Sequence, residues 1–127
     1  MAETRIIIAG PRDFFNYDFI SEKAFSVINK LNISKDEIRI ISGHAEGVDK
    51  SGERFAEVNK YKLSIFPAEW GIYGNTAGFI RNGRMARFAI ENGSQGILIA
   101  FINGSKGTKN MLEQARKYNL KTYIFKI

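Results

Sequence analysis

Two glycine-containing loops carry residue types that bind phosphate. The segments Ser-Gly-His-Ala-Glu-Gly-Val-Asp (residues 42–49) and Asn-Gly-Ser-Lys-Gly-Thr (residues 103–108) follow short apolar runs at residues 38–41 and 97–102. A strand that turns through glycines into the start of a helix leaves backbone N–H groups unpaired, and the helix dipole adds partial positive charge there. Two such loops in a chain of 127 residues indicate a ligand that carries phosphate.

The first loop contains five candidates for ligand contact. We expect the Ser42 hydroxyl and the amides around Gly43 and Gly47 to cradle phosphate. Asp49 falls in the first turn of the next helix, where the dipole favours a carboxylate and where it could also accept hydrogen bonds from ribose. His44 is the single histidine and could act as an acid or a base. Because no partner carboxylate or nucleophile is evident, we expect His44 to make a loop contact or a hydrogen bond to the ligand.

The second loop offers a further phosphate site. The residues concerned are Gly104, Gly107 and Thr108, through backbone amides and the threonine hydroxyl. Lys106 could add charge to this site or lie in solvent. No pattern of metal ligands accompanies the loop, although a phosphate ligand could bring Mg²⁺ with it.

The loop at residues 10–14, Gly-Pro-Arg-Asp-Phe, follows the first apolar run and should reach the same edge of a sheet. After Gly10, Arg12 could clamp a phosphate or carboxylate with two hydrogen bonds, or lie in solvent. Asp13 could meet a ribose hydroxyl, although capping the next helix is the commoner role for an aspartate in this position. We therefore include these three residues in the candidate ligand site.

Two further segments, at residues 66–70 and 77–85, add aromatic and charged residues. Trp70 could stack on a base or pack against the sheet edge. Glu69 is the best-placed carboxylate for a ribose hydroxyl or for catalysis, so it is the candidate catalytic residue. Arg81 and Asn82 lie near the start of a predicted helix and are expected to contact the ligand, whereas the other arginines of that helix are expected to form a solvated basic face.

Alternating apolar runs and helical patterns predict an α/β fold. The five runs at residues 5–9, 38–41, 63–66, 96–101 and 122–127 are mostly continuous, which is typical of parallel strands covered on both faces. Apolar residues at three-to-four spacing predict helices at residues 17–31, 48–59, 79–90 and 108–118. We therefore expect one domain over residues 1–127, a Rossmann-like three-layer sandwich with a mainly parallel sheet of about five strands. Ligands of such sheets bind at the carboxyl ends of the strands, where these loops fall.

Composition restricts the function further. The chain has a formal net charge of +6 and a pI of about 9.7, which favours anionic partners such as nucleotides or nucleic acid. It has no cysteine and one histidine, so no disulfide and no thiolate or histidine metal site is expected. No apolar run approaches the length of a membrane span, and the N-terminus lacks a signal-peptide layout. We expect a cytoplasmic protein with no membrane partner.

Five ordered segments together resemble the SLOG superfamily, most closely its small YspA/YpsA-related proteins. These segments are GPRDF (10–14), SGHAEGVD (42–49), FPAEW (66–70), AGFIRNGRM (77–85) and GSKGTKNM (104–111). The similarity extends over about residues 6–124. It implies a Rossmann-like fold, a nucleotide-derived ligand and a tendency to self-associate, so a homo-oligomer is expected to be among the partners.

Two better-known relatives suggest different activities. DNA-processing protein A, which binds single-stranded DNA, has a segment similar to residues 42–49. The Lonely Guy phosphoribohydrolases, which split a nucleoside monophosphate into base and ribose phosphate, share a Gly-Gly-x-Gly-Thr-x-x-Glu loop and an upstream catalytic arginine. Here the glutamate of that loop falls on Met111, while Glu113 lies two residues later on a different part of the helix. Arg81 or Arg84 could replace the arginine, but hydrolysis would need Glu69 as the carboxylate.

Three functions follow from the sequence. The leading hypothesis is a module that senses or sequesters a phosphate-bearing, nucleotide-derived ligand. The second is a hydrolase of a nucleotide N-glycosidic bond, because a carboxylate normally stabilises the cation-like sugar of that reaction. The third is binding of single-stranded DNA. The positive charge favours this function, but the sequence has no obvious stripe of alternating basic and exposed aromatic residues.

Overall fold

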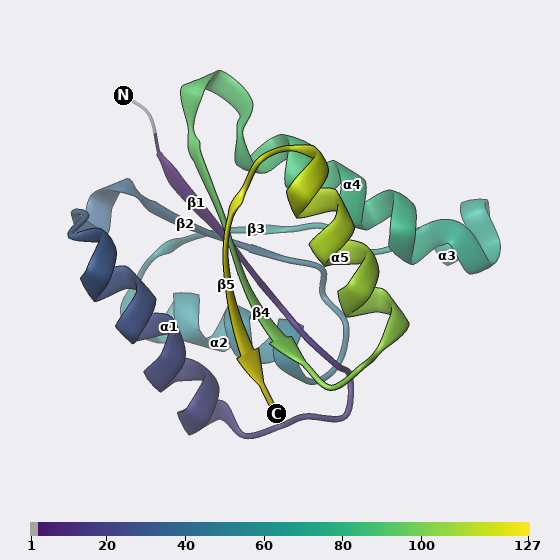
Figure 1. The fold of residues 1–127 in the computed structure, drawn as a ribbon, viewed down its shortest axis with the longest axis horizontal. Helices are drawn as coiled ribbons and strands as arrows, with labels where there is room; N and C mark the ends of the chain where they lie inside the picture. The colour runs from purple at the N-terminus through teal and green to yellow at the C-terminus, as the bar shows by residue number, and fades with distance from the viewer. Residues whose placement is uncertain (1–2) are drawn as a thin grey trace.

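The structure is a computed structural model that describes residues 3–127, and it shows a sheet between two layers of helices (Figure 1). The sheet has five parallel strands in the order β3-β2-β1-β4-β5. The strands are β1 (Thr4–Ala9), β2 (Ile38–Ser42), β3 (Lys62–Ile65), β4 (Gln95–Ile102) and β5 (Lys121–Lys126). The predicted α/β fold with about five parallel strands is confirmed.

The helices alternate with the strands along the chain. The α-helices are α1 (Tyr17–Leu31), α2 (Val48–Asn59), α3 (Trp70–Tyr73), α4 (Ala77–Ala89) and α5 (Lys106–Lys117), and 3-10 turns lie at Lys35–Glu37, Gly74–Thr76 and Glu91–Gly93. Helices α1 and α2 cover one face of the sheet, and α4 and α5 cover the other. The first two helices match the predicted ranges, while α4 and α5 each begin two residues earlier than predicted.

Strand β1 divides the hydrophobic core between the two faces. Ile6 and Ile8 pack with α1 and α2, whereas Ile7 and Ala9 pack with α4 and α5. In register, Ile6 lies beside Ile40 of β2 and Ile97 of β4, and all three are fully buried. Because both faces of the central strands are covered, these strands have continuous apolar sequences, as predicted from the sequence.

Helix α2 contains a glycine that lets it approach the sheet. A Cβ atom at Gly52 would lie 3.1 Å from the Cβ atom of Ile8, which is closer than most such contacts. Glycine in a helix costs about 1 kcal/mol relative to alanine. The close packing of α2 on β1 offsets this cost, and it brings the N-terminus of α2 next to the end of β1.

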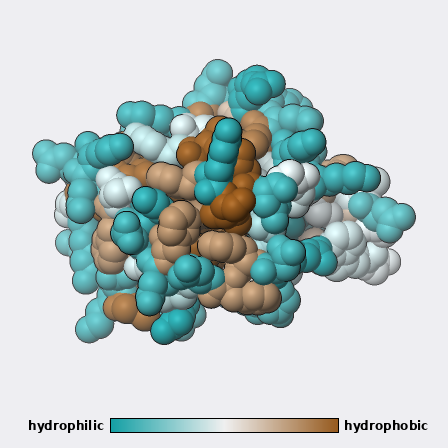
Figure 2. All heavy atoms as spheres, turned by 60° about the horizontal axis from the view of Figure 1, so that its bottom comes forward, coloured by the Kyte–Doolittle hydropathy of each residue, from teal (hydrophilic) through white to brown (hydrophobic). Residues whose placement is uncertain are grey.

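The order of the strands creates a crevice between β1 and β4. The chain leaves β1 toward α1 on one face and leaves β4 toward α5 on the other, so the loops after these neighbouring strands separate. This is the position at which open α/β sheets bind ligands. Figure 2 shows the molecule from the side on which strands β4 and β5 end. Hydrophobic residues gather in the middle of that face, with hydrophilic residues around them.

Candidate functional site

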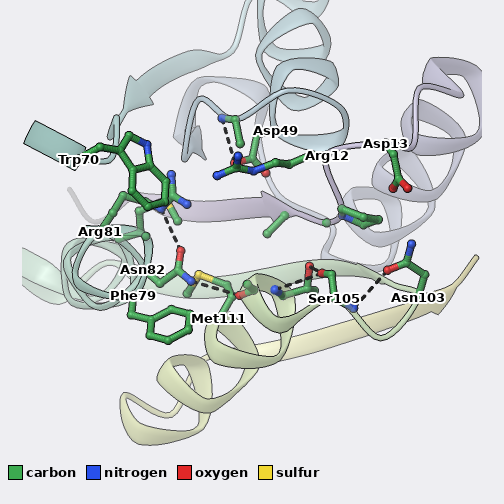
Figure 3. A pocket seen from close by; sticks show the side chains of 18 of the residues that line it. Arg12, Asp13, Asp49, Trp70, Phe79, Arg81, Asn82, Asn103, Ser105 and Met111 are labelled. Atoms are coloured by element: carbon green, nitrogen blue, oxygen red, sulfur yellow. Dashed lines mark hydrogen bonds between the residues drawn. The ribbon is translucent and has the colours of Figure 1, made fainter. Parts of the chain in front are cut away.

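A pocket of about 420 Å³ opens at this crevice (Figure 3). Its wall combines the loop after β1, the start of α2, helices α3 and α4, and the loop from β4 into α5. Nine of the predicted ligand residues line it: Gly10, Arg12, Asp13, Asp49, Trp70, Arg81, Asn82, Gly107 and Thr108. Segments that are distant in the sequence therefore meet at one place, as the strand order requires.

The first turn of α5 forms one end of the pocket, which Ser105, Gly107 and Thr108 line. The Ser105 side chain caps this helix by accepting a hydrogen bond from the Thr108 N–H at 3.4 Å, and its hydroxyl also lies 2.8 Å from the Thr108 hydroxyl. The first amide bonded to a backbone carbonyl is that of Lys109, which donates to Ser105. The amides of Lys106 and Gly107 precede that bond, and the dipole of the helix favours negative charge beside them.

Asp49 and Arg81 form the buried, charged part of the pocket. Asp49 is 5% exposed, and its Oδ2 accepts the Ala45 N–H at 3.3 Å. Burial raises the pKa of the Asp49 carboxyl to about 6, although Arg81 acts to lower it. Burial also lowers the pKa of the Arg81 guanidinium, while Asp49 acts to raise it. Arg81 donates to the Gly43 carbonyl, so Gly43 supports this arginine without lining the pocket.

Asn82 connects the two helices on this side of the sheet. Its buried amide nitrogen donates to the Gly107 carbonyl at 3.2 Å and to Asn110 Oδ1 at 3.1 Å. Its oxygen accepts a hydrogen bond from Arg81 Nε at 2.9 Å. Asn82 therefore fixes Arg81 relative to the first turn of α5, and its polar atoms are used by the protein.

Aromatic residues stand at the other end of the pocket. Trp70 is 49% exposed and Phe79 is 46% exposed, and both line the pocket. The exposed guanidinium of Arg12 lies 5.6 Å from the centre of the Trp70 ring. Figure 3 shows Trp70 and Phe79 at one side, Ser105 and Asn103 at the other, and Arg12 with Asp49 between them. An elongated ligand with a planar group at one end and negative charge at the other fits this arrangement.

His44 and Ser42 lie outside the pocket and share a carboxylate. Ser42 is fully buried and its hydroxyl donates to Glu53 Oε2 at 2.8 Å, the same oxygen that lies 2.8 Å from His44 Nδ1. Lys50 Nζ lies 3.2 Å from His44 Nε2 and can donate only, so His44 donates from Nδ1 to Glu53. No carboxylate partner for His44 is evident in the sequence, and the structure supplies Glu53 from the second turn of α2.

Gly47 lets the loop after β2 approach the loop after β1 closely. It has φ +79°, and a Cβ atom there would lie 2.5 Å from the Pro11 carbonyl oxygen. That oxygen accepts a hydrogen bond from the Val48 N–H at 3.3 Å, so the loop after β1 already covers the N-terminus of α2. Of residues 42–49, only Ala45 and Asp49 line the pocket. The first glycine loop thus supplies a carboxylate to the pocket, while Gly107 and Thr108 of the second loop are the predicted phosphate-binding residues that line it.

Glu69 and Gly104 are also placed away from the pocket. Glu69 forms an ion pair with Arg84 at 2.7 Å, and Arg84 also donates to the Tyr73 hydroxyl at 3.0 Å. Arg84 is therefore exposed but paired, which differs from the solvated arginine expected from the sequence. Gly104 has φ +93° and forms the turn before α5 without lining the pocket.

Several lining residues were missing from the sequence prediction. They include Ala45, Asn75, Gly78, Phe79, Asn103 and Ser105. Ser105 had a usable signal, because a serine just before a predicted helix is a favoured N-cap. Phe79 had none, since an aromatic residue in an amphipathic helix is more often part of the core. Met111, the position at which the sequence resemblance places the glutamate of the phosphoribohydrolases, is buried and also lines the pocket.

Neither a metal-binding cluster nor a membrane-spanning helix is found in the described residues. Within residues 3–127, no three or more His, Asp or Glu side chains gather closely enough to hold a metal ion. Nor does any helix in this range combine the length and apolar character needed to cross a membrane.

One solved structure is informative for the fold. DNA processing protein A (DprA) from Streptococcus pneumoniae matches 97% of this chain with a TM-score of 0.62 and 15% sequence identity. The chain spans about half the length of that protein, since 50% of it is covered. No protein-family model and no curated protein matches the sequence. The likeness supports the SLOG-like fold implied by the sequence motifs, and at this identity it establishes the fold alone.

Proposed function

We propose that this protein binds a phosphate-bearing, nucleotide-derived ligand in the pocket between β1 and β4, as a sensing or sequestering module of the SLOG superfamily. The observation that carries the proposal is the composition of this pocket. Two arginines and the first turn of a helix share it with two exposed aromatic side chains and a buried carboxylate. Those are the groups that recognise phosphate, base and ribose.

Each part of the ligand has a defined place in this proposal. The phosphate lies on the first turn of α5, where Gly107 and Thr108 line the pocket. The base stacks against Trp70 or Phe79 at the opposite end. Asp49 lies between the two ends and accepts hydrogen bonds from ribose hydroxyls, while Arg12 adds charge to the mouth.

Native mass spectrometry of the freshly purified protein provides the first test. A co-purified molecule, released on denaturation, would be identified by its mass as a nucleotide or as something else. Calorimetric titration with nucleoside monophosphates, nucleoside diphosphates and inorganic phosphate would then rank the ligand classes. The proposal fails if neither experiment finds a phosphate compound bound.

Gly107→Asp tests the position of the phosphate. A Cβ atom at Gly107 would meet no atom within 4 Å, so the substitution fits, and an aspartate in a first helical turn is favoured by the dipole. The new carboxylate would repel phosphate and weaken nucleotide binding at least about tenfold. Gly71→Asp is the matched control, because Gly71 is equally open and lies outside the pocket lining. Equal affinities of both variants would place the phosphate elsewhere.

A second candidate function is hydrolysis of a nucleotide N-glycosidic bond, and the place of Asp49 favours it. Glu69 is the carboxylate that the sequence offers for this reaction, but it is paired with Arg84 outside the pocket. Asp49 is the buried carboxylate that lines it. In this reaction water adds to the sugar carbon, the base leaves with a proton, and the Asp49 carboxylate stabilises the cation-like sugar.

Chromatography separates binding from turnover. Incubation with nucleoside monophosphates would release free base and ribose phosphate from the wild-type protein, and Asp49→Asn would abolish the release. A protein that binds nucleotide but releases no base at high enzyme concentration is a binding module only.

A further inference from the structure

The two helical layers differ strongly in charge. Helix α4 carries three arginines and no acidic residue, and α5 carries four basic residues and one acidic residue, which gives the pair a formal charge of +6. On the other face, α1 has two basic and two acidic residues, and α2 has two basic and three acidic residues, so that pair has −1. The charge of the α4–α5 layer thus equals the formal net charge of the whole chain.

Most cations of the α4–α5 layer have no acidic partner in the described part of the chain. Five of them are exposed and take part in no ion pair there: Arg87, Lys106, Lys109, Arg116 and Lys117. Arg84 differs, because it is paired with Glu69. A single unpaired cation is well solvated in water, but the concentration of such cations on one face creates a positive potential that attracts polyanions.

The two helices form one continuous surface. Asn82 of α4 donates to Asn110 of α5, and a Cβ atom at Gly83 would lie 3.4 Å from the Gln114 side chain, so α4 and α5 pack side by side (Figure 1). The first turn of α5 belongs both to this surface and to the pocket. A chain of phosphates on the helices would therefore adjoin the pocket end that suits a single phosphate.

We propose that the exposed face of α4 and α5 binds the phosphodiester backbone of a nucleic acid. The charge asymmetry and the unpaired cations carry the polyanion part of this inference. The choice of nucleic acid over an acidic protein rests on the proposed function, because the adjoining pocket is suited to a nucleotide. Arg87, Lys109 and Lys117 would contact phosphates without reading sequence, so binding would depend steeply on salt.

Fluorescence anisotropy with a labelled oligo(dT) and a labelled DNA duplex tests the proposal. The Arg87→Gln/Lys117→Gln variant removes one exposed cation from each helix, away from the first turn of α5, and should weaken binding about tenfold. It should also reduce the slope of log K against log salt by about 1.4 for the single strand, since each lost phosphate contact contributes about 0.7. The two DNA probes show whether the surface takes single strands, duplexes or both.

The matched control is Lys30→Gln/Lys35→Gln, which removes the same charge from exposed lysines outside the α4–α5 layer. Equal weakening by this control, or no binding of either DNA at about 50 mM salt, would overturn the proposal. Competition by polyglutamate at the same charge concentration as DNA would also overturn it in favour of an acidic protein.

A further titration keeps this proposal distinct from the proposed function. Nucleotide binding in the pocket should be unchanged in Arg87→Gln/Lys117→Gln, because neither residue lines the pocket. If the pocket binds no nucleotide while the DNA binding and its loss in the variant persist, the nucleotide proposal fails and the charged surface stands.

Discussion

The two ends of the sheet each bring a carboxylate together with basic side chains, but with opposite results. At the amino ends of the strands, Glu3 accepts hydrogen bonds from Arg5 Nε at 2.9 Å, from Arg39 at 2.9 and 3.2 Å, and from Lys62 at 3.3 Å. The hydrogen bond from Arg39, with those from Arg5 and Lys62, lowers the pKa of the Glu3 carboxyl to about 2. At the carboxyl ends, burial raises the pKa of the Asp49 carboxyl to about 6.

The difference lies in direct hydrogen bonds. Both oxygens of Glu3 are bonded to cations, whereas the Asp49 side chain accepts, within residues 3–127, only the Ala45 N–H, and Arg81 is bonded to the Gly43 carbonyl instead. A carboxylate with direct charged donors stabilises the fold, while a buried one without them is destabilising when ionised. The protein keeps this cost at the pocket, where a ligand could supply the missing donors.

The strongest test of the comparison replaces each acid by its amide. Glu3→Gln should lower the free energy of unfolding at pH 7 by about 1–2 kcal/mol, because it removes charge-assisted hydrogen bonds. Asp49→Asn should raise it by about 1–3 kcal/mol, because the neutral amide can still accept the Ala45 N–H without a desolvated charge. Chemical denaturation measures both. Destabilisation by Asp49→Asn would mean that Arg81 satisfies this carboxylate after all.

The pH dependence of stability sharpens the same contrast. The ordinary pKa of Asp49 is 3.8 and the folded value is about 6, so the unfolded state loses its proton first as the pH rises. The wild type should therefore lose stability relative to Asp49→Asn between about pH 4 and about pH 6, with no further change above. Glu3 has the opposite sign, since its pKa is lowered from 4.5 to about 2 and its contribution disappears as the pH falls through that range.

Denaturation of the wild type and Asp49→Asn at several pH values measures this difference directly. Arg12, Arg81 and Glu53 are the charged groups that shift the pKa of Asp49, and none of them is changed in the variant. A difference in unfolding free energy that stays constant from about pH 4 to about pH 7 would show that the carboxyl of Asp49 has an ordinary pKa.

The sequence predicts the helices and strands of the fold better than the side-chain pairs that form between them. The three central strands were predictable because buried parallel strands have continuous apolar sequences, and α1 and α2 because their apolar residues keep helical spacing. Helix α3 was missed, since its four residues, Trp70–Tyr73, are too few to show a period. The short helix matters for the site, because it begins with Trp70 at the pocket.

The candidate site was predictable where it depends on strand order and not where it depends on side-chain contacts. Arg12, Asp49 and Gly107 each follow a different strand, and the switch between β1 and β4 brings them to one pocket. The ion pair of Glu69 with Arg84 joins residues 15 apart, and no periodic pattern links them. The same holds for Glu3 and Lys62, which are 59 residues apart.

Arg12→Ala tests the pocket end of the comparison with a milder change. Arg12 is exposed and its side chain takes part in no hydrogen bond or ion pair among the described residues, so stability should change by less than about 0.5 kcal/mol. Nucleotide affinity should fall about tenfold, as expected for one charge-assisted hydrogen bond to phosphate. Arg54→Ala is the control, because Arg54 is also exposed and lies 4.0 Å from the Tyr17 ring. Calorimetric titration compares the three proteins, and equal affinities would remove Arg12 from the site.

The smallest effect is expected at Lys62, which is the most exposed of the three cations around Glu3. Lys62 is 52% exposed and contacts Glu3 at 3.3 Å, so water competes for this ion pair. Exposed pairs contribute about 0–1 kcal/mol, and Lys62→Met should lower the free energy of unfolding by less than about 0.5 kcal/mol. Arg39 donates two hydrogen bonds to the same carboxylate, so Arg39→Met should cost several times more. If the two variants were equally stable in urea denaturation, the low pKa of Glu3 would reflect the total positive charge around it. The carboxylate at the amino ends of the strands would then be stabilised by that charge rather than by directed hydrogen bonds.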